Sequence, residues 1–332
     1  MSTLYGLWGS AVTRGQVKAS RAFAERIVQL AESGEQRGFL SAGHAALGYS
    51  LLVGGKPQQA QRHLDLARSY LDESDPRPLV KESSIILLMS PMLVVLALGF
   101  PDRARRLADE AVRHAEGIGP YVEGIVRVHA AVLYLRLRDP QHILENANAL
   151  SRIAKENPAF TGQANEFTGQ GLWMQGKRRE AMEVMAQARS YNEAAGMRIT
   201  RARELNFEAR FLAHNDRTDE ALAKVEEALQ ESEELGADRP STLRLRGDLL
   251  VQREAQASQV KSAYQQAITC ARDLENKWEE LQTMAHFARW LKNQGRRDEA
   301  RTMLAAIYNW FTEGFDTADL KDTKTLLHEL SQ

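Results

Sequence analysis

The chain has 332 residues, and its 43 basic and 44 acidic residues leave a formal net charge of -1 at pH 7. This balance excludes the strongly basic domain that is typical of nucleic-acid binders. Cys270 is the only cysteine, which excludes a disulfide framework and a cluster of thiolate metal ligands. No secretory signal is visible at the N-terminus, and together with the lone cysteine this favours a reducing, cytoplasmic setting.

The dominant pattern is a short phrase that recurs along the whole chain: a Gly or Asp, a few polar residues, and then an Ala. Clear copies begin at Gly55, Gly99, Gly176, Asp216 and Gly295; weaker copies begin at Gly15 and Asp139, and a degraded copy lies near Ala255. Successive copies start about 40 residues apart, a period that is typical of stacked helical repeats. Because a solenoid buries its core locally, one domain can extend over the whole chain.

Between these phrases, apolar residues recur at spacings of three and four, which predicts amphipathic helices. An early example is the helix that carries Leu40, Ala45, Leu47, Leu51 and Leu52. The apolar run 85–98 is broken by Ser90 and Pro91 and is shorter than the roughly 18 residues of a membrane span, so we expect a buried helix with a proline kink. Further on, the polar stretch 252–259 replaces the tight turn, and we predict that the seventh repeat is irregular there, as the fourth is near Asp139.

The last segment predicts a cap for the stack. Gly314 suits the left-handed position that ends a helix, and Asp316 or Thr317 can cap the next one. The final apolar stripe, which would cover the open end, consists of Leu320, Leu326, Leu327 and Leu330. Three aromatic residues are expected to pack beneath this helix, with an exposed docking patch as the alternative: Trp310, Phe311 and Phe315. We therefore predict one continuous solenoid over residues 1–316, with a capping helix of the same domain over residues 317–332.

Small residues stand where the two helices of a pair must approach closely. The position on the first helix holds Gly48, Gly169, Ala209, Gly247 and Ala288, and the position on the second holds Ala67, Ala111, Ala188, Ala228 and Ala267. With the phrase that ends in Ala, this pairing resembles the tetratricopeptide repeat (TPR), although the period is longer than the usual 34 residues. The resemblance implies an all-α, right-handed superhelical solenoid of about eight antiparallel helix pairs.

The two ends of the chain carry a second resemblance. Residues 285–291, 294–301 and 307–321, together with residues 4–8 and Arg14-Gly15, resemble the C-terminal TPR region of large bacterial signalling proteins. Those proteins carry a class III adenylate/guanylate cyclase domain, or a DNA-binding domain, followed by a predicted ATPase of the AAA/STAND type. The resemblance implies a regulatory module and carries over no cyclase or ATPase activity, because this sequence contains neither domain.

The candidate binding site comes from the register of the repeats. In TPR stacks the first helix of each pair lines a concave groove, and the residues that this register assigns to the groove are Tyr49, Leu52, Arg136, Gln170, Trp173, Arg203, Asn206, Arg210, Arg244, Arg289, Lys292 and Asn293. The C-terminal half of the groove would be rich in Arg and Asn, which suit carboxylate or phosphate groups and an extended peptide backbone. The hypothesis is an acidic peptide or protein segment in this half of the groove; the alternative is a solvated face with local ion pairs.

The functional prediction is a non-catalytic module for protein–protein interaction and regulation. Its partner would be a protein, an acidic peptide segment or other domains of the same polypeptide, without nucleic acid or membrane, and a homo-oligomer is compatible with the sequence. No catalytic residue, cofactor or metal site is predicted. The alternative is a small-molecule effector domain like those of bacterial transcription activators, which needs a closed pocket of a few hundred Å3. An enzyme would require titratable groups that converge in a cleft.

Overall fold

The computed structural model describes residues 1–34, 37–72, 74–75 and 77–332, and within these ranges it contains helices and no strand. The helices of the first half are α1 (Ser2–Thr13), α2 (Val17–Ser33), α3 (Arg37–Val53), α4 (Pro57–Tyr70), α5 (Pro78–Ala97), α6 (Pro101–Glu116), α7 (Pro120–Arg136) and α8 (Pro140–Ile153). Those of the second half are α9 (Thr161–Met174), α10 (Arg178–Ala194), α11 (Arg201–His214), α12 (Thr218–Glu231), α13 (Arg239–Gln252), α14 (Ala257–Asp273), α15 (Lys277–Asn293), α16 (Arg297–Tyr308) and α17 (Ala318–Ser331). Two short 3-10 helices, η1 (Pro158–Phe160) and η2 (Gly236–Asp238), precede α9 and α13.

These helices pack as consecutive pairs, from α1 with α2 to α15 with α16, and α17 packs on the last pair. In the described part of the chain there are thus eight pairs and one terminal helix, which confirms the all-α, TPR-like solenoid. The glycines of the repeated phrase take left-handed backbone angles, with φ of +77° at Gly55, +83° at Gly176 and +75° at Gly295. The next N–H then reaches back to the end of the first helix, as when Lys177 N donates to Leu172 O at 3.0 Å.

The degraded copies of the phrase form the same tight turn. Arg138 and Glu254 take the left-handed position with φ of +57° and +56°, and Ala255 N donates to Leu250 O at 3.0 Å. The prediction that residues 252–259 replace a tight turn is therefore wrong, since α13 ends at Gln252 and α14 begins at Ala257. A residue other than Gly can occupy this region at a cost of about 1–2 kcal/mol, which the packed helices on both sides offset.

The small residues lie at the crossing of each pair, as the repeat pattern predicted. A Cβ atom on Gly48 would stand 2.9 Å from Leu64 Cγ, and one on Gly247 would stand 2.8 Å from Tyr264 Cε1. On the second helices, Ala67, Ala188 and Ala267 are fully buried. Larger side chains at these positions would force the two helices apart.

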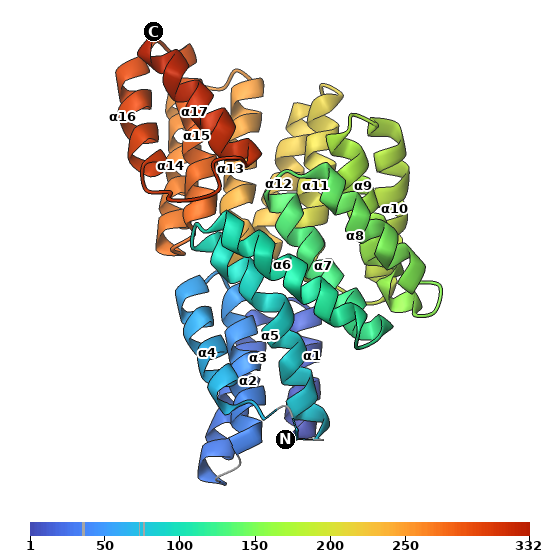
Figure 1. Cartoon of the computed structure of the whole chain (residues 1–332). Helices are drawn as coiled ribbons and strands as arrows, with labels where there is room; N and C mark the ends of the chain where they lie inside the picture. Colours follow the sequence, from blue (N-terminus) through green and yellow to red (C-terminus); the bar gives the residue numbers. More distant parts are fainter. Residues whose placement is uncertain (35–36, 73, 76) are drawn as a thin grey trace.

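The apolar run 85–98 lies in α5, which continues through Pro91. By length and composition alone, α5 could cross a membrane, but the core helix of a soluble protein passes the same test, and 67% of its apolar window is buried within the protein. The prediction of a buried helix is confirmed. In Figure 1, α5 belongs to the teal helices that lie between the blue N-terminal helices and the orange and red C-terminal ones.

Successive turns of the superhelix touch each other. Thr13 O accepts a hydrogen bond from Arg198 N at 2.9 Å, Gly55 faces the backbone of Gly236, and Arg138 Nη1 lies 3.2 Å from Asp319 Oδ1. In each case the partner lies about 180 residues further along the chain. About four and a half repeats therefore make one turn of the superhelix. The short connections between the two helices of each of the first four repeats contact the second half of the molecule.

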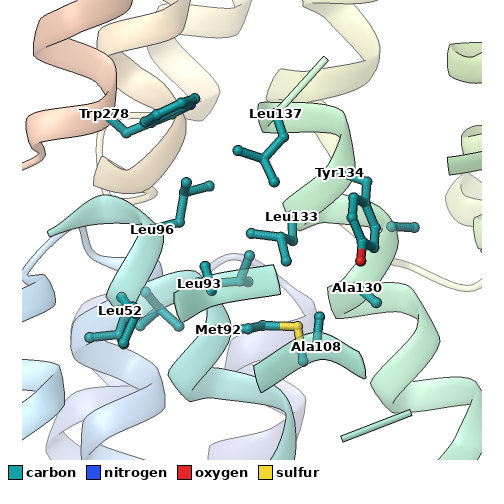
Figure 2. Packing of buried hydrophobic residues seen from close by; sticks show 14 of the residues in the cluster. Leu52, Met92, Leu93, Leu96, Ala108, Ala130, Leu133, Tyr134, Leu137 and Trp278 are labelled. Carbon is teal, nitrogen blue, oxygen red and sulfur yellow. The ribbon is translucent and has the colours of Figure 1, made fainter. Parts of the chain in front are cut away.

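Trp278 of α15 is an apolar contact between the two superhelical turns. It is 1% exposed and belongs to one apolar core that joins the first four repeats to the last two. Figure 2 shows its ring facing Leu96 of α5 and Leu137, which follows α7. Its Nε1 donates to Arg136 O at 3.1 Å, and Gln282 Nε2 donates to the same oxygen at 3.1 Å.

The C-terminal cap has the predicted position, with Gly314 at φ +80° and Leu320, Leu326 and Leu330 buried. Of the three aromatic residues expected beneath it, Phe311 is buried, whereas Trp310 and Phe315 are 40% and 47% exposed. The prediction is wrong for these two. Trp310 instead covers Gly99 in the turn before α6, where any Cβ atom would stand 2.3 Å from Trp310 Cζ3, so it joins the two superhelical turns.

Candidate binding cavity on the concave side

The first helices of the middle repeats surround a cavity of about 290 Å3. Spacings of three and four residues bring polar side chains of each helix to this side, as with Arg203, Asn206 and Arg210 on α11. Seven of the predicted groove residues line the cavity: Arg136, Gln170, Trp173, Arg203, Asn206, Arg210 and Arg244. The repeat register therefore places these seven around one space.

The remaining predicted residues lie elsewhere. Arg289, Lys292 and Asn293 line a separate cleft of about 320 Å3 between α15 and α17, where Lys292 Nζ pairs with Glu329 Oε2 at 2.7 Å. Tyr49 is buried, and its hydroxyl lies 3.1 Å from His129 Nε2. Leu52 is buried in the core beside it.

Four of the cavity arginines have carboxylate partners within the protein, among them Arg138, which pairs with Asp319 and Asp322. Arg203 Nε lies 2.5 Å from Glu166 Oε1, Arg244 forms an ion pair with Glu279, and Arg136 Nη2 lies 3.2 Å from Asp238 Oδ1. Reasoning from the register of the arginines alone missed these acids. The spacing in the sequence could have indicated these ion pairs. Glu166 and Glu279 stand 37 and 35 residues from their arginines, about one repeat away on the neighbouring first helix.

Burial governs the electrostatics of these pairs. Glu166 is 0% exposed, and its burial raises the pKa of its carboxyl group although Arg203 opposes the change. The side chain of Asp248 is half-buried; burial would raise its pKa, but His286 and Tyr264 outweigh burial and lower it. The two partners bond to Asp248 Oδ1, His286 through Nδ1 at 2.8 Å and Tyr264 through its hydroxyl at 2.7 Å.

Arg210 differs from the other cavity arginines. Among the described residues, its guanidinium group has no hydrogen-bond or ion-pair partner, whereas each cavity carboxylate already has one. Burial and the neighbouring charge of Arg244 lower the pKa of Arg210, although an arginine stays protonated in proteins. Its side chain stands at the junction between the cavity and an adjoining hollow of about 400 Å3.

Two amides beside the cavity also have unused hydrogen-bonding atoms. Gln170 is 2% exposed, and Asn206 is 4% exposed. Gln170 Nε2 and Asn206 Oδ1 have no partner within the described part of the chain, while Asn206 Nδ2 donates to Thr242 Oγ1 at 2.7 Å. Buried polar atoms are nearly always paired, so unpaired ones beside a cavity indicate a place for a ligand.

In chemical terms, the cavity offers a cation, and two amides behind its surface, Gln170 and Asn206, have an unused donor and an unused acceptor. Trp173 adds an aromatic wall, with the Arg178 guanidinium 4.0 Å from its ring centroid. No group of three or more His, Cys, Asp or Glu side chains that could hold a metal ion occurs among the residues that the structure describes. The half-buried thiol of Cys270 lies outside this cavity, and burial raises its pKa. The arrangement is suited to binding an anion.

The fold and the cavity define a TPR-like superhelical repeat protein with a polar interior site. No family model matches the chain, and no curated protein matches it. Among solved structures, it is similar to yeast Tom70 (TM-score 0.39, 12% identity, 99% of this chain and 88% of that chain) and to the P58(IPK) TPR domain (TM-score 0.28, 13% identity, 100% and 99%). It is also similar to a chain of Naa15/Naa10 bound to HypK-THB (TM-score 0.31, 12% identity, 99% and 55%).

Proposed function

We propose that this chain is a non-catalytic regulatory module that recognises a protein partner on the concave side of its superhelix. The observation that carries this proposal is the unpartnered Arg210 at the mouth of the interior cavity. An acidic segment would lie in the adjoining hollow and direct one carboxylate to Arg210, because a guanidinium group binds carboxylates through two parallel hydrogen bonds. The exposed His214 lines this hollow and would contact the segment.

The test uses a fluorescently labelled acidic peptide and its fluorescence anisotropy. The peptide should bind the wild-type chain, and Arg210→Glu should weaken binding at least tenfold, because it replaces attraction by repulsion. Arg289→Glu is the matched control, since Arg289 lies in the other cleft and should leave binding unchanged. Equal affinity of the peptide for the wild type and Arg210→Glu would contradict the proposal.

The resemblance to bacterial cyclase-associated repeat regions supports a wider role. In this proposal the chain is a sensor or scaffold of a larger cytoplasmic signalling protein, and binding in the groove regulates a cyclase or ATPase domain. The test is to read the coding sequence upstream of Met1. A cyclase or ATPase domain in the same frame or in the adjacent gene would support this context, and unrelated upstream genes would count against it.

A second candidate function, the sensing of a small-molecule effector, is favoured by the shape of the site. The contacts between superhelical turns narrow the groove to a cavity of about 290 Å3, close to the lower end of the usual range for ligand pockets. Four of its arginines are already neutralised by internal carboxylates, so they offer less to a long acidic peptide than the sequence suggested.

A further inference from the structure

Within the described ranges, the charged groups of the cavity form pairs, except that Arg210 has no partner and Asp248 has only His286 and Tyr264. Arg136, Arg203 and Arg244 each face a carboxylate. An arginine without a hydrogen-bond partner can gain charge-assisted hydrogen bonds from an anion. Arg210 is half-buried and has no hydrogen-bond or ion-pair partner among the described residues, although the charges of Asp248 and Glu279 act on it, and its position beside open space lets an anion from solution bind it.

The neighbours of Arg210 narrow the class of ligand. Asn206 lies four residues before it on α11, so the two side chains project from the same face of the helix. Asn206 Oδ1 is an unused acceptor, and Gln170 Nε2 on the adjacent α9 is an unused donor. The complement of this set is an anionic oxygen for Arg210 and Gln170, and a hydroxyl or amino group for Asn206.

The volume of the cavity limits the size of the ligand. The cavity of about 290 Å3 adjoins the hollow of about 400 Å3 through shared lining residues, among them Trp173 and Arg210. A small molecule can therefore enter from the hollow and place its anionic end in the interior. An extended peptide would have to pass the contacts between α7 and α15 that close the cavity on the other side.

We infer that the interior cavity is a binding site for a small organic anion, a carboxylate or phosphate that also carries a hydroxyl or amino group, with Arg210 as the charge partner. The inference rests on the second candidate function and names its ligand class. The ligand would contact side chains of α9 and α11, and the other walls of the cavity belong to α7, α13 and α15. Because it binds the closed superhelix, it would stabilise the closed form over any opened one.

The experiment is a thermal-unfolding titration of the full chain with three probes at constant ionic strength: inorganic phosphate, succinate and malate. Succinate and malate differ by one hydroxyl group, so they test the unused acceptor of Asn206. At least one probe should raise the Tm with saturation, and malate should bind more tightly than succinate. The phosphate and carboxylate arms distinguish a phosphorylated ligand from a carboxylic acid.

Two variants locate the effect. Arg210→Gln should weaken the binding of the effective probe about tenfold or more, as expected for the loss of a charge-assisted hydrogen bond. Arg289→Gln is the matched control and should bind like the wild type. If Arg210→Gln does not fold, Gln170→Glu serves in its place, because it keeps the shape of the side chain and sets a negative charge against the anion. Trp173 supplies a local signal: the probe should change the tryptophan fluorescence, and Trp173→Phe should abolish that change.

The inference is overturned if none of the three probes raises the Tm, or if Arg210→Gln binds the effective probe as tightly as the wild type. His214→Glu separates this result from the protein-binding function. It places a negative charge in the outer hollow and should weaken the acidic peptide far more than the small anion. Peptide binding without probe binding would refute the small-anion site alone, and probe binding without peptide binding would refute the protein partner alone.

Discussion

Replacing Trp278 with Ala tests whether the two superhelical turns hold each other in place. The side chain is 1% exposed, and a buried Trp removes roughly 150–250 Å2 from water. At about 25 cal/mol per Å2, this area corresponds to roughly 4–6 kcal/mol, and measured Trp→Ala changes in cores cost about 3–5 kcal/mol. The lost hydrogen bond adds little, because Arg136 O still accepts from Gln282. We expect the free energy of unfolding to fall by about 4 kcal/mol in urea denaturation.

Trp310→Ala is the comparison, since Trp310 also joins the two turns but is 40% exposed. It should cost about 1–2 kcal/mol, in proportion to the smaller buried area. A double-mutant cycle between Trp278→Ala and Leu96→Ala should show a coupling energy of at least about 0.5 kcal/mol, because the two side chains face each other across the turns (Figure 2). A cost below about 1 kcal/mol for Trp278→Ala, or no coupling to Leu96, would refute the contact between superhelical turns.

Three further predictions concern the turns, the buried ion pair and acid stability. In urea denaturation, Gly314→Ala should destabilise the chain more than Gly176→Ala. Both glycines have a positive φ, but only at Gly314 would an added Cβ meet another atom, Pro101 Cγ at 2.0 Å. Equal losses of unfolding free energy would contradict this packing. Arg203→Met should lower the free energy of unfolding by about 3–5 kcal/mol, because it leaves Glu166 buried without its ion-pair partner. Adding Glu166→Leu to this variant should recover most of the lost stability. If the stability is not recovered, the ion pair is not the cause of the loss. Burial lowers the pKa of His129 to about 4, so between about pH 6.5 and 4 the unfolded chain binds more protons than the folded one and the stability falls as the pH is lowered. His129→Gln should reduce the difference in unfolding free energy between pH 7 and pH 5 by about 1–2 kcal/mol, and an unchanged difference would exclude His129 as a source of it.

The local features of the fold were predictable from the sequence. Gly55, Gly176 and Gly295 begin turns because glycine enters the left-handed region without strain, and this constraint acts over a few residues. Gly48 and Gly247 marked the helix crossings for a similar reason, since the absence of a side chain is itself the signal. The error at residues 252–259 shows the limit of such signals: a missing glycine does not abolish a turn when the flanking helices pack well enough to hold Glu254 in the left-handed region.

The candidate site was predictable in part. Periodicity assigned Arg203, Asn206 and Arg210 to the concave face, because a helix of 3.6 residues per turn has only one way to present them together. Periodicity did not show which of the cations are neutralised. That depends on the partner helix of the adjacent repeat, and the acids were visible in the sequence only as unassigned polar positions such as Glu166 and Glu279.

The sequence by itself thus determined the helices, their pairing and the face that each turns inward, because these follow from contacts within about one repeat. Only the tertiary structure decided that successive turns of the superhelix contact each other and that Trp278 packs between them. Only the tertiary structure also decided that, among the described residues, Arg210 is the cavity arginine that lacks a partner. The physical reason is that the pitch of a superhelix is the sum of many small packing angles between neighbouring helices. Residues about 180 positions apart meet only for one value of that sum, and no short pattern in the sequence records it.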